Sequence, residues 1–156
     1  MPKHNWSKWM RLQELRKCNF DKVPEEPGVY QIASVKQKMI RRLRGKDNGG
    51  LLYVGESGSL RGRIRKFCDC VEDKKKKKET HVAGWRYNLV RLYRCAPPDS
   101  LKFRWRCAKN KAAALTAQSE VLYAYVDDHC ELPPLNYNLE RALMEKLGWR
   151  LKRHNS

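Results

Sequence analysis

Two short runs that each hold one tyrosine and one glycine constrain the fold of this chain more than any other feature. The first reads Gly-Val-Tyr at Gly28–Tyr30, and the second reads Tyr-Val-Gly at Tyr53–Gly55. Both runs are apolar, favour extended backbone and have turn-forming residues at their borders, which is the pattern of two short β-strands. Paired strands of this kind would bring two phenol side chains together where glycine leaves the backbone uncovered.

A third strand and several helices complete the predicted fold. Residues 101–107 alternate apolar and cationic side chains, which predicts a strand with one buried face. Helical spacing of apolar residues predicts helices over residues 5–17, 60–71, 80–92, 109–128 and 139–148. We therefore predict a chain of the α/β class (α+β type), with a small three-stranded, mainly antiparallel sheet flanked by helices.

The length of 156 residues has room for one domain, 1–156, with little left for a second. Within it we expect an N-terminal helical extension at 1–22, a basic insertion at 34–50 that ends in a turn signal, and a C-terminal helix at 139–148. No internal repeat and no flexible linker divides the sequence.

The charge indicates a polyanionic partner. The chain has 34 Lys and Arg against 17 Asp and Glu, a formal net charge of +17. So large an excess opposes compaction by self-repulsion, and it favours nucleic acid because neutralised phosphates release counterions. A membrane surface comes second, but no basic amphipathic helix stands out, and no membrane partner is expected. The cations that we expect to face nucleic acid are Arg41, Arg42, Arg44, Arg61, Arg65, Lys102, Arg104 and Arg106.

The N-terminal residues and the cysteines favour the cell interior. We expect no signal peptide and no membrane-spanning segment, since no apolar run is long enough. The six cysteines are scattered, so we expect reduced thiols. These features predict a cytoplasmic location, or a nuclear one in a eukaryotic cell.

Five parts in sequence order resemble the GIY-YIG nuclease family. They are the two Tyr–Gly runs, Arg63 in the following helix, Glu120 in a later helix and Asn136 after a pair of prolines. The step from Tyr53 to Arg63 agrees with the family's spacing, and the resemblance covers residues 27–138. Members of this family are mostly metal-dependent endonucleases. The resemblance thus implies a GIY-YIG-like domain that hydrolyses DNA phosphodiester bonds in a restriction, mobile-element or repair role.

The resemblance also implies roles for individual residues. It implies that Glu120 binds the single divalent ion, Mg²⁺ or Mn²⁺, and that Arg63 binds the scissile phosphate. It implies that Tyr30 helps to deprotonate the attacking water, with Tyr53 and Asn136 completing the site. A single carboxylate suits Mg²⁺, which keeps several of its waters. An arginine clamps two phosphate oxygens at once, so lysine would not fully replace Arg63.

The chemistry of the phenols sets a condition on these roles. A free phenol has a pKa of about 10 and is a weak base at neutral pH. Tyr30 could act as a base only if a nearby cation lowered its pKa, or if it worked through water on the metal. Tyr53 is expected to hold geometry, and Asn136 to orient the phosphate or the metal's water shell by hydrogen bonds.

Two features depart from the family's pattern. The segment at 34–50 makes the gap between the tyrosines longer than in compact members. Phe67 stands four residues after Arg63, where members often carry a histidine or tyrosine that can transfer a proton. His81 stands near a place where some members carry histidine, so the resemblance gives that role to His81 instead.

Other interpretations stay open from the sequence. Strand tyrosines are often only half-buried, Arg63 could belong to a solvated helix face and Glu120 could be an ordinary surface residue. The alternative function is a non-catalytic basic protein that binds DNA or RNA on the same scaffold, and the oligomeric state, a dimer included, stays open. A third interpretation is a zinc-stabilised ribonucleoprotein component, although Cys-x-Cys is not the usual ligand spacing and zinc is not expected. Its ligands would be Cys68, Cys70, His81 and Cys130.

Overall fold

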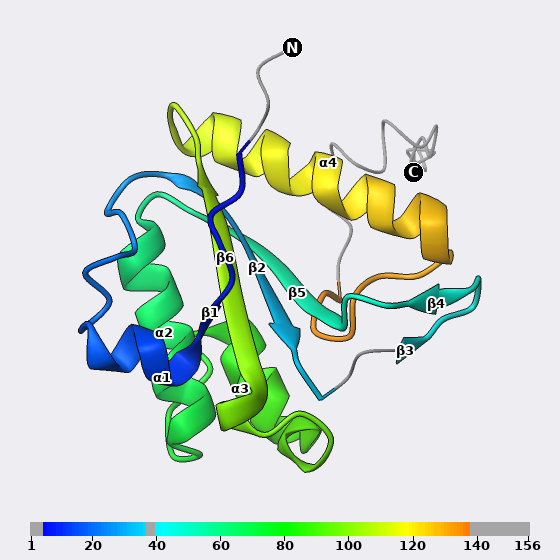
Figure 1. Ribbon diagram of the computed structural model, residues 1–156, viewed down its shortest axis with the longest axis horizontal. Helices are drawn as coiled ribbons and strands as arrows, with labels where there is room; N and C mark the ends of the chain where they lie inside the picture. Colours follow the sequence, from blue (N-terminus) through cyan, green and yellow to red (C-terminus); the bar gives the residue numbers. More distant parts are fainter. Residues whose placement is uncertain (1–4, 37–39, 138–156) are drawn as a thin grey trace, which may run out of the picture.

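The computed structural model describes residues 5–36 and 40–137, which form a mixed α/β fold (Figure 1). The strands in this part of the chain are β1 (Met10–Arg11), β2 (Gly28–Ser34), β3 (Ile40–Arg41), β4 (Lys46–Asp47), β5 (Leu51–Ser57) and β6 (Leu101–Cys107). The α-helices are α1 (Leu12–Lys17), α2 (Leu60–Glu72), α3 (Val82–Leu89) and α4 (Lys111–His129). Two short 3-10 helices, Leu92–Arg94 and Pro98–Ser100, lie between α3 and β6.

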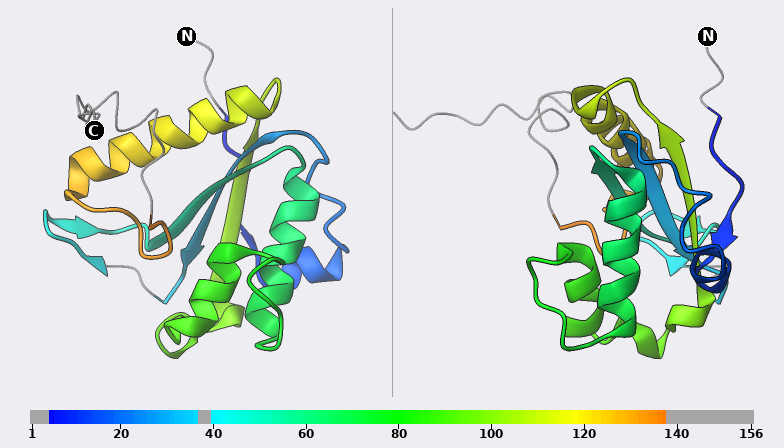
Figure 2. Two further views of the ribbon diagram at one scale, coloured as in Figure 1. Left: turned by 180° about the vertical axis from the view of Figure 1, so that it is seen from behind. Right: turned by 90° about the vertical axis from the view of Figure 1, so that its left-hand side faces the viewer.

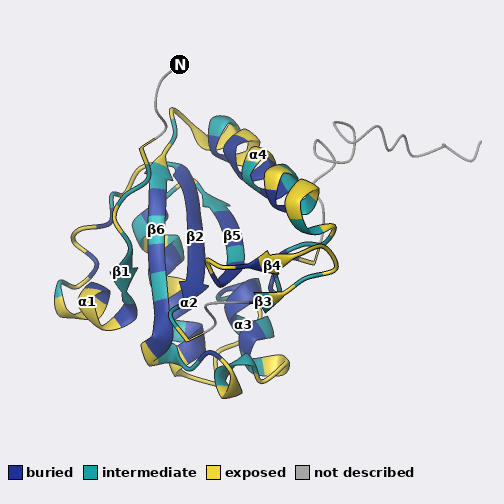
Figure 3. Cartoon of the chain, turned by 45° about the vertical axis from the view of Figure 1, so that its right-hand side comes forward, coloured by how far each residue is buried: buried dark blue, intermediate teal, exposed yellow. Residues whose placement is uncertain are grey.

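The main sheet has four antiparallel strands in the order β1-β6-β2-β5. The three predicted strands are therefore confirmed, but the predicted number was short by one. The fourth strand, β1, is only two residues long and pairs with β6. β2 lies inside the sheet, and all seven of its residues are buried (Figure 3). β3 and β4 form a separate hairpin within the predicted basic insertion.

Alternation of side chains along β2 separates two cores. Tyr30 and Ile32 belong to the core that α2 and α3 cover. Leu60 and Ile64 of α2 are fully buried in this core, and removing each from water contributes about 2 kcal/mol. Val29 belongs to the other core, which α4 covers. The sheet thus lies between α4 on one face and α2 with α3 on the other (Figures 1 and 2).

The N-terminal segment, residues 5–9, is extended, so the predicted helix is wrong in its first half. The Ser7 N–H donates to the Trp105 carbonyl at 2.8 Å, and the Trp105 N–H donates to the Ser7 hydroxyl at 3.0 Å. Trp6 and Trp9 pack over the cations of β6. These long-range contacts outweigh the helical spacing of the tryptophans, because intrinsic helix propensity is a weak preference.

The β3–β4 hairpin is tied to the C-terminal end of α4. The Nε of Arg42 donates to the Tyr125 hydroxyl at 3.0 Å, and Nη1 of Arg42 pairs with Glu131 at 3.1 Å. The Tyr125 hydroxyl donates to Asp47 at 2.9 Å, and Asp47 also accepts from two backbone N–H groups of the turn that follows it. The segment predicted as a basic insertion is thus anchored by buried polar contacts.

The outer edge of β5 is covered by the chain that follows α4. The Leu135 N–H donates to the Leu52 carbonyl at 2.9 Å. The Asn136 side chain exchanges two hydrogen bonds of 2.9 Å with the backbone N–H and carbonyl of Val54. Gln118 of α4 donates to the same Val54 carbonyl at 3.1 Å. An open strand edge invites pairing with another chain, so these bonds protect the sheet.

The two ends of the chain lie partly outside the described residues. The predicted C-terminal helix at 139–148 is among the parts that the structure does not describe. Of the predicted helical extension at 1–22, only α1 is helical within the residues that are described. Across 5–36 and 40–137, no helix combines the length and the apolar character that crossing a lipid bilayer requires.

Candidate functional site

The two predicted tyrosines meet on the face of the sheet that carries α2 and α3. In the pairing of β2 with β5, Tyr30 lies opposite Gly55, and Tyr53 lies opposite Ile32. The ring centroids of Tyr30 and Tyr53 are 5.9 Å apart, in an edge-to-face arrangement. A Cβ atom at Gly55 would lie 2.5 Å from the hydroxyl oxygen of Tyr30. The glycine of the second run therefore makes room for the tyrosine of the first.

His81 and Arg63 join the tyrosine pair. His81 precedes the first turn of α3, and its Nε2 lies 2.9 Å from the Tyr30 hydroxyl. Its ring centroid is 6.0 Å from that of Tyr53 and 5.2 Å from that of Phe67. Arg63, on α2, is close enough for its charge to shift the pKa values of Tyr30, Tyr53 and His81. Four of the six predicted catalytic residues therefore come together.

The hydrogen bonds of His81 fix the direction of proton donation. Its Nδ1 accepts from the backbone N–H of Gly84 at 3.3 Å, as an N-cap side chain does. In a neutral imidazole the other nitrogen then carries the proton. The Nε2–H of His81 therefore donates to the hydroxyl oxygen of Tyr30, which leaves the Tyr30 proton free to be donated onward.

Burial keeps both phenols protonated. It raises the pKa of Tyr30 well above the ordinary value, and Tyr53 raises it further, while the charge of Arg63 acts in the opposite direction. Burial also raises the pKa of Tyr53, again against the charge of Arg63. The lowered pKa that a basic Tyr30 would need is therefore absent, and the protonated Tyr30 accepts a hydrogen bond from His81.

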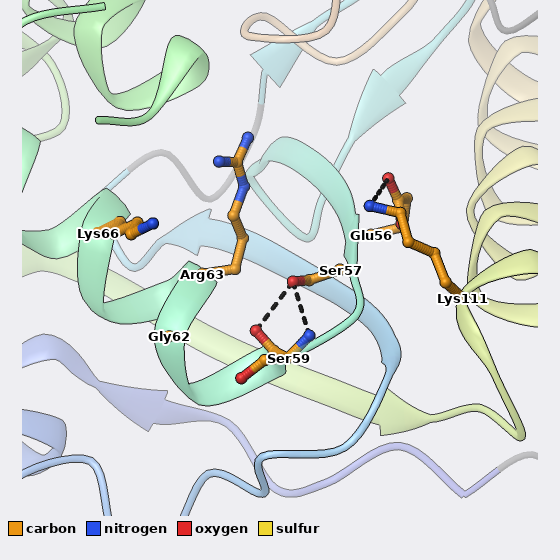
Figure 4. A pocket seen from close by; sticks show the side chains of 7 residues that line it. All are labelled: Glu56, Ser57, Ser59, Gly62, Arg63, Lys66 and Lys111. Carbon is orange, nitrogen blue, oxygen red and sulfur yellow. Dashed lines mark hydrogen bonds and ion pairs between the residues drawn. The ribbon is translucent and has the colours of Figure 1, made fainter. Parts of the chain in front are cut away.

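Arg63 connects this cluster to an open pocket at the end of β5. The cavity has a volume of about 370 Å³ and lies between the beginnings of α2 and α4 (Figure 4). Arg63 and Lys66 line it from α2, and Lys111 lines it from α4. Ser57 and Ser59 add hydroxyl groups. Three cations with hydroxyl donors suit a phosphate group, which offers several charged acceptor oxygens.

One carboxylate, Glu56, lines the same pocket, and sequence reasoning missed it. Its Oε1 lies 3.9 Å from Nζ of Lys111, and its Oε2 is buried without a hydrogen-bond partner among the described residues. Glu56 lies opposite Val29 in the pairing of β2 with β5, so its side chain leaves β5 on the α4 side of the sheet, the face opposite to the phenols. Its charge still adds to burial in raising the pKa of Tyr53. A signal for it existed: Glu56 directly follows the Tyr-Val-Gly run and precedes the helix of Arg63.

Glu120, the predicted metal ligand, does not join this group. Its side chain is exposed on α4. Gln118 of α4 hydrogen-bonds the backbone of β5, and it lies two residues earlier and about 200° around the helix. The Oε1 of Gln118 is buried without a hydrogen-bond partner among the described residues. The resemblance implied that Glu120 lies beside Arg63. In the structure it does not, because Glu120 points away from the buried face of α4.

Asn136 is held by the fold. It is buried at the edge of β5, and both polar atoms of its amide bond to the backbone of Val54. A phosphate or a metal's water shell would have to compete with these bonds. Asn136 therefore positions β5, and with it Tyr53, rather than facing the pocket as predicted.

Three of the predicted nucleic-acid-binding arginines are used by the fold. Arg61 pairs with Glu25 at 2.8 Å, and Arg65 donates to the Asn19 carbonyl at 2.8 Å. The side chain of Arg42 is only 8% exposed because of its contacts with α4 and Glu131. These guanidinium groups hold loops in place, and their contact with a polyanion stays a prediction.

The other predicted cations lie nearer to solvent. Arg41 and Arg44 are exposed in the hairpin, where Arg44 also donates to a backbone carbonyl of α4 at 2.7 Å. Lys102, Arg104 and Arg106 form the row on β6 that the alternating pattern predicted, opposite the buried face of that strand. This row lies on the α4 side of the sheet and not beside the tyrosine pair.

The residues considered for zinc do not form a ligand set. No disulfide joins the six cysteines, all of which lie in the described ranges; Cys68 and Cys70 are buried, whereas Cys130 is exposed. Both ring nitrogens of His81 hydrogen-bond within the protein. Within the described ranges no group of three or more His, Cys, Asp or Glu side chains could hold a metal ion together.

Comparisons with protein-family models, with curated proteins and with solved structures found no match to this chain. The function is therefore argued from the geometry of the site and from the resemblance of its motifs.

We expect the uncharged, buried His81 to make the fold sensitive to acid. Burial, with the charges of Arg63 and Lys66, lowers the pKa of His81 from 6.5 to about 3. Between these values the unfolded chain binds a proton that the folded chain does not. The free energy of unfolding should therefore fall as the pH falls, by up to about 1.4 kcal/mol per pH unit from this group. Urea unfolding at about pH 7, 6 and 5 measures the slope.

His81→Asn is the matched variant, because asparagine can still cap α3 but has no titrating ring. It should lose most of this slope, and His129→Asn, at the end of α4, controls for the change of residue type. An unchanged slope in His81→Asn would contradict a neutral His81 in the folded protein.

Proposed function

We propose that this protein is a metal-dependent endonuclease that hydrolyses a DNA phosphodiester bond in the pocket beside Arg63. The observation that carries the proposal is that Arg63, which acts on the buried cluster of Tyr30, Tyr53 and His81, also lines an open pocket together with two further cations. Buried polar groups are costly unless they have partners, so such a cluster serves a core poorly and a bound phosphate well. The resemblance of the motifs to the GIY-YIG family supports the same reaction.

Glu56 fits the role of metal ligand better than Glu120 does. A buried carboxylate oxygen without a partner is unfavourable, and a cation would satisfy it. Mg²⁺ is commonly held by only one or two carboxylates, together with water and substrate phosphate. Mg²⁺ or Mn²⁺ at Glu56 would supply positive charge and an activated water to the reaction. Glu120, exposed on α4, offers no such environment.

The side chains of the site bind and orient the phosphate. Arg63 can donate two parallel hydrogen bonds to non-bridging oxygens, and Lys66 and Lys111 balance the remaining charge. Tyr30 is fully buried, whereas Tyr53 is partly exposed. We assign its hydroxyl as a hydrogen-bond donor to the phosphate or to the leaving oxygen. Water attacks phosphorus and releases a proton to the solvent, the bond to the leaving oxygen breaks, and that oxygen takes up a proton from the solvent, while the protonated phenols donate hydrogen bonds rather than act as bases.

A plasmid-nicking assay tests this function and the place of the metal. We expect the wild-type protein to nick DNA with Mg²⁺ but not with EDTA. Glu56→Gln should lower the rate by about 100-fold or more, because a catalytic metal contributes several kcal/mol of charge stabilisation. Glu120→Gln is the matched control and should nick at the wild-type rate. A lower nicking rate in Glu120→Gln, with an unchanged rate in Glu56→Gln, would instead place the metal at Glu120 on α4.

Binding of nucleic acid without cleavage is the second candidate. It is favoured by one observation: Gln118, which hydrogen-bonds the backbone of β5 from α4, is an amide with no charge for a metal. This candidate predicts salt-sensitive binding of DNA or RNA and no nicking of any DNA, branched substrates included, with Mg²⁺ or Mn²⁺.

A further inference from the structure

A layer of aromatic rings and cations covers the outer face of β6. Cζ of Arg104 lies 4.8 Å from the ring centroid of Trp6 and 4.6 Å from that of Trp9. Nζ of Lys102 lies 4.7 Å from the centroid of Trp9, and Cζ of Arg106 lies 5.3 Å from that of Trp6. Both tryptophans remain partly exposed. Stacking rings among cations are the usual elements of a surface that binds single-stranded nucleic acid.

Arg104 is held at one edge and open at the other. Its Nε donates to Oε1 of Gln31 at 2.6 Å, while the two indole rings flank its guanidinium. In the described part of the chain, the Nη groups of Arg104 and the amide nitrogen of Gln31 donate no hydrogen bond. These donors are already oriented, so little conformational freedom is lost when an acceptor binds.

A cavity of about 180 Å³ opens beside these donors. The rings of Trp9, Tyr125 and His129 line it, together with the side chains of Gln31 and Arg104. A cavity of about 150 Å³ holds one benzene ring, so this one has room for a single heterocycle of similar size. Aromatic walls with convergent donors match a nucleobase, which stacks through its face and accepts hydrogen bonds at its edge.

We propose that this cavity binds one unpaired pyrimidine base of a nucleic acid whose backbone follows the cations of β6. The base stacks on Trp9, and Arg104 and Gln31 donate to its carbonyl oxygens. This inference rests on the proposed function, because it specifies that the DNA substrate carries an unpaired nucleotide.

The cavity is separate from the pocket of Arg63. The cavity touches Leu51 at the beginning of β5, and the pocket touches Glu56 near its end. Five residues of extended strand span about 17 Å. A DNA that joins a duplex to a short unpaired segment could therefore contact both sites at once.

Fluorescence anisotropy with two oligomers of equal length and backbone charge, oligothymidine and an abasic oligomer, tests the proposal. We expect the wild-type protein to bind oligothymidine about tenfold more tightly than the abasic oligomer. Arg104→Lys keeps the charge but removes the planar donor, so it should lose most of this preference. Trp9→Leu should lose the preference because the ring on which the base stacks is missing. Arg94→Lys, at an exposed arginine after α3, should keep it.

The outcomes separate this proposal from the endonuclease proposal. A wild-type protein with no preference for oligothymidine, or one that binds neither oligomer, overturns the base-binding site even if nicking is observed. The base-binding site is also overturned if Arg104→Lys and Trp9→Leu both keep the full preference for oligothymidine. If the two variants lose the preference but the wild-type protein does not nick DNA, the base-binding site stands and the endonuclease proposal fails.

Discussion

Replacing Arg63 with alanine should lower the rate of plasmid nicking by roughly 10³-fold with little change in the affinity for DNA. Removing one donor that stabilises developing charge costs about 10²–10³ in rate. Arg63 also supplies the cation nearest the phenol pair, so its loss removes charge from the cluster as well as from the phosphate. Binding should change little because Arg63 is one of 34 Lys and Arg side chains. Nicking time courses with Mg²⁺, and anisotropy at fixed salt, measure the two quantities.

Arg63→Lys separates charge from geometry. Lysine restores the positive charge but not the two parallel hydrogen bonds, so we expect it to recover roughly tenfold of the lost rate. Arg94→Ala removes an exposed arginine elsewhere and should leave the rate unchanged, which controls for net charge. Nicking by Arg63→Ala at the wild-type rate would mean that the phosphate is bound somewhere else.

A methyl group at position 55 should displace Tyr30 and weaken the fold. The Cβ atom of an alanine would lie 2.5 Å from the hydroxyl oxygen of Tyr30 and 2.7 Å from its Cε1. The ring is fully buried in β2 and hydrogen-bonded to His81, so it cannot turn aside without disturbing both. We expect Gly55→Ala to lower the free energy of unfolding by about 2–3 kcal/mol and to abolish nicking. Urea unfolding and the nicking assay measure these effects.

Gly62→Ala is the matched substitution for stability. At that position of α2, the nearest atom to a new Cβ would be the Ser59 hydroxyl at 3.5 Å, an ordinary contact. Alanine inside a helix is favoured over glycine by up to about 1 kcal/mol, so this variant should be slightly more stable than the wild type. The two glycine substitutions are thus expected to act in opposite directions. Equal stability of Gly55→Ala and the wild type would contradict the position of Tyr30 over Gly55.

The main strands could be predicted because their signals are local. Along β6 the buried residues alternate with partly exposed ones in the order that the sequence shows. The two Tyr–Gly runs form β2 and β5, and the facing of Tyr30 with Gly55 explains why a tyrosine in the first run goes with a glycine in the second. Helix α2 begins directly after β5 and carries Arg63 close to both phenols. This proximity could be predicted because the connection between β5 and α2 is short.

The parts that sequence reasoning missed depend on contacts between distant residues. Trp6 and Trp9 have helical spacing, but their partners are cations of β6 nearly one hundred residues later. The resemblance gives the metal to Glu120, yet the buried face of α4 passes through Gln118 instead. Glu56 carried no periodic signal, and its importance follows only from the buried, unpaired oxygen that the pocket holds.

The covered edge of β5 restricts how this molecule can associate with others. Asn136 and Leu135 already occupy the hydrogen-bonding positions beside Val54 and Leu52. A second copy, or a peptide that adds as an extra strand, would first have to displace this segment from the sheet. Self-association of the protein should therefore not proceed by adding a strand at the β5 edge of the sheet.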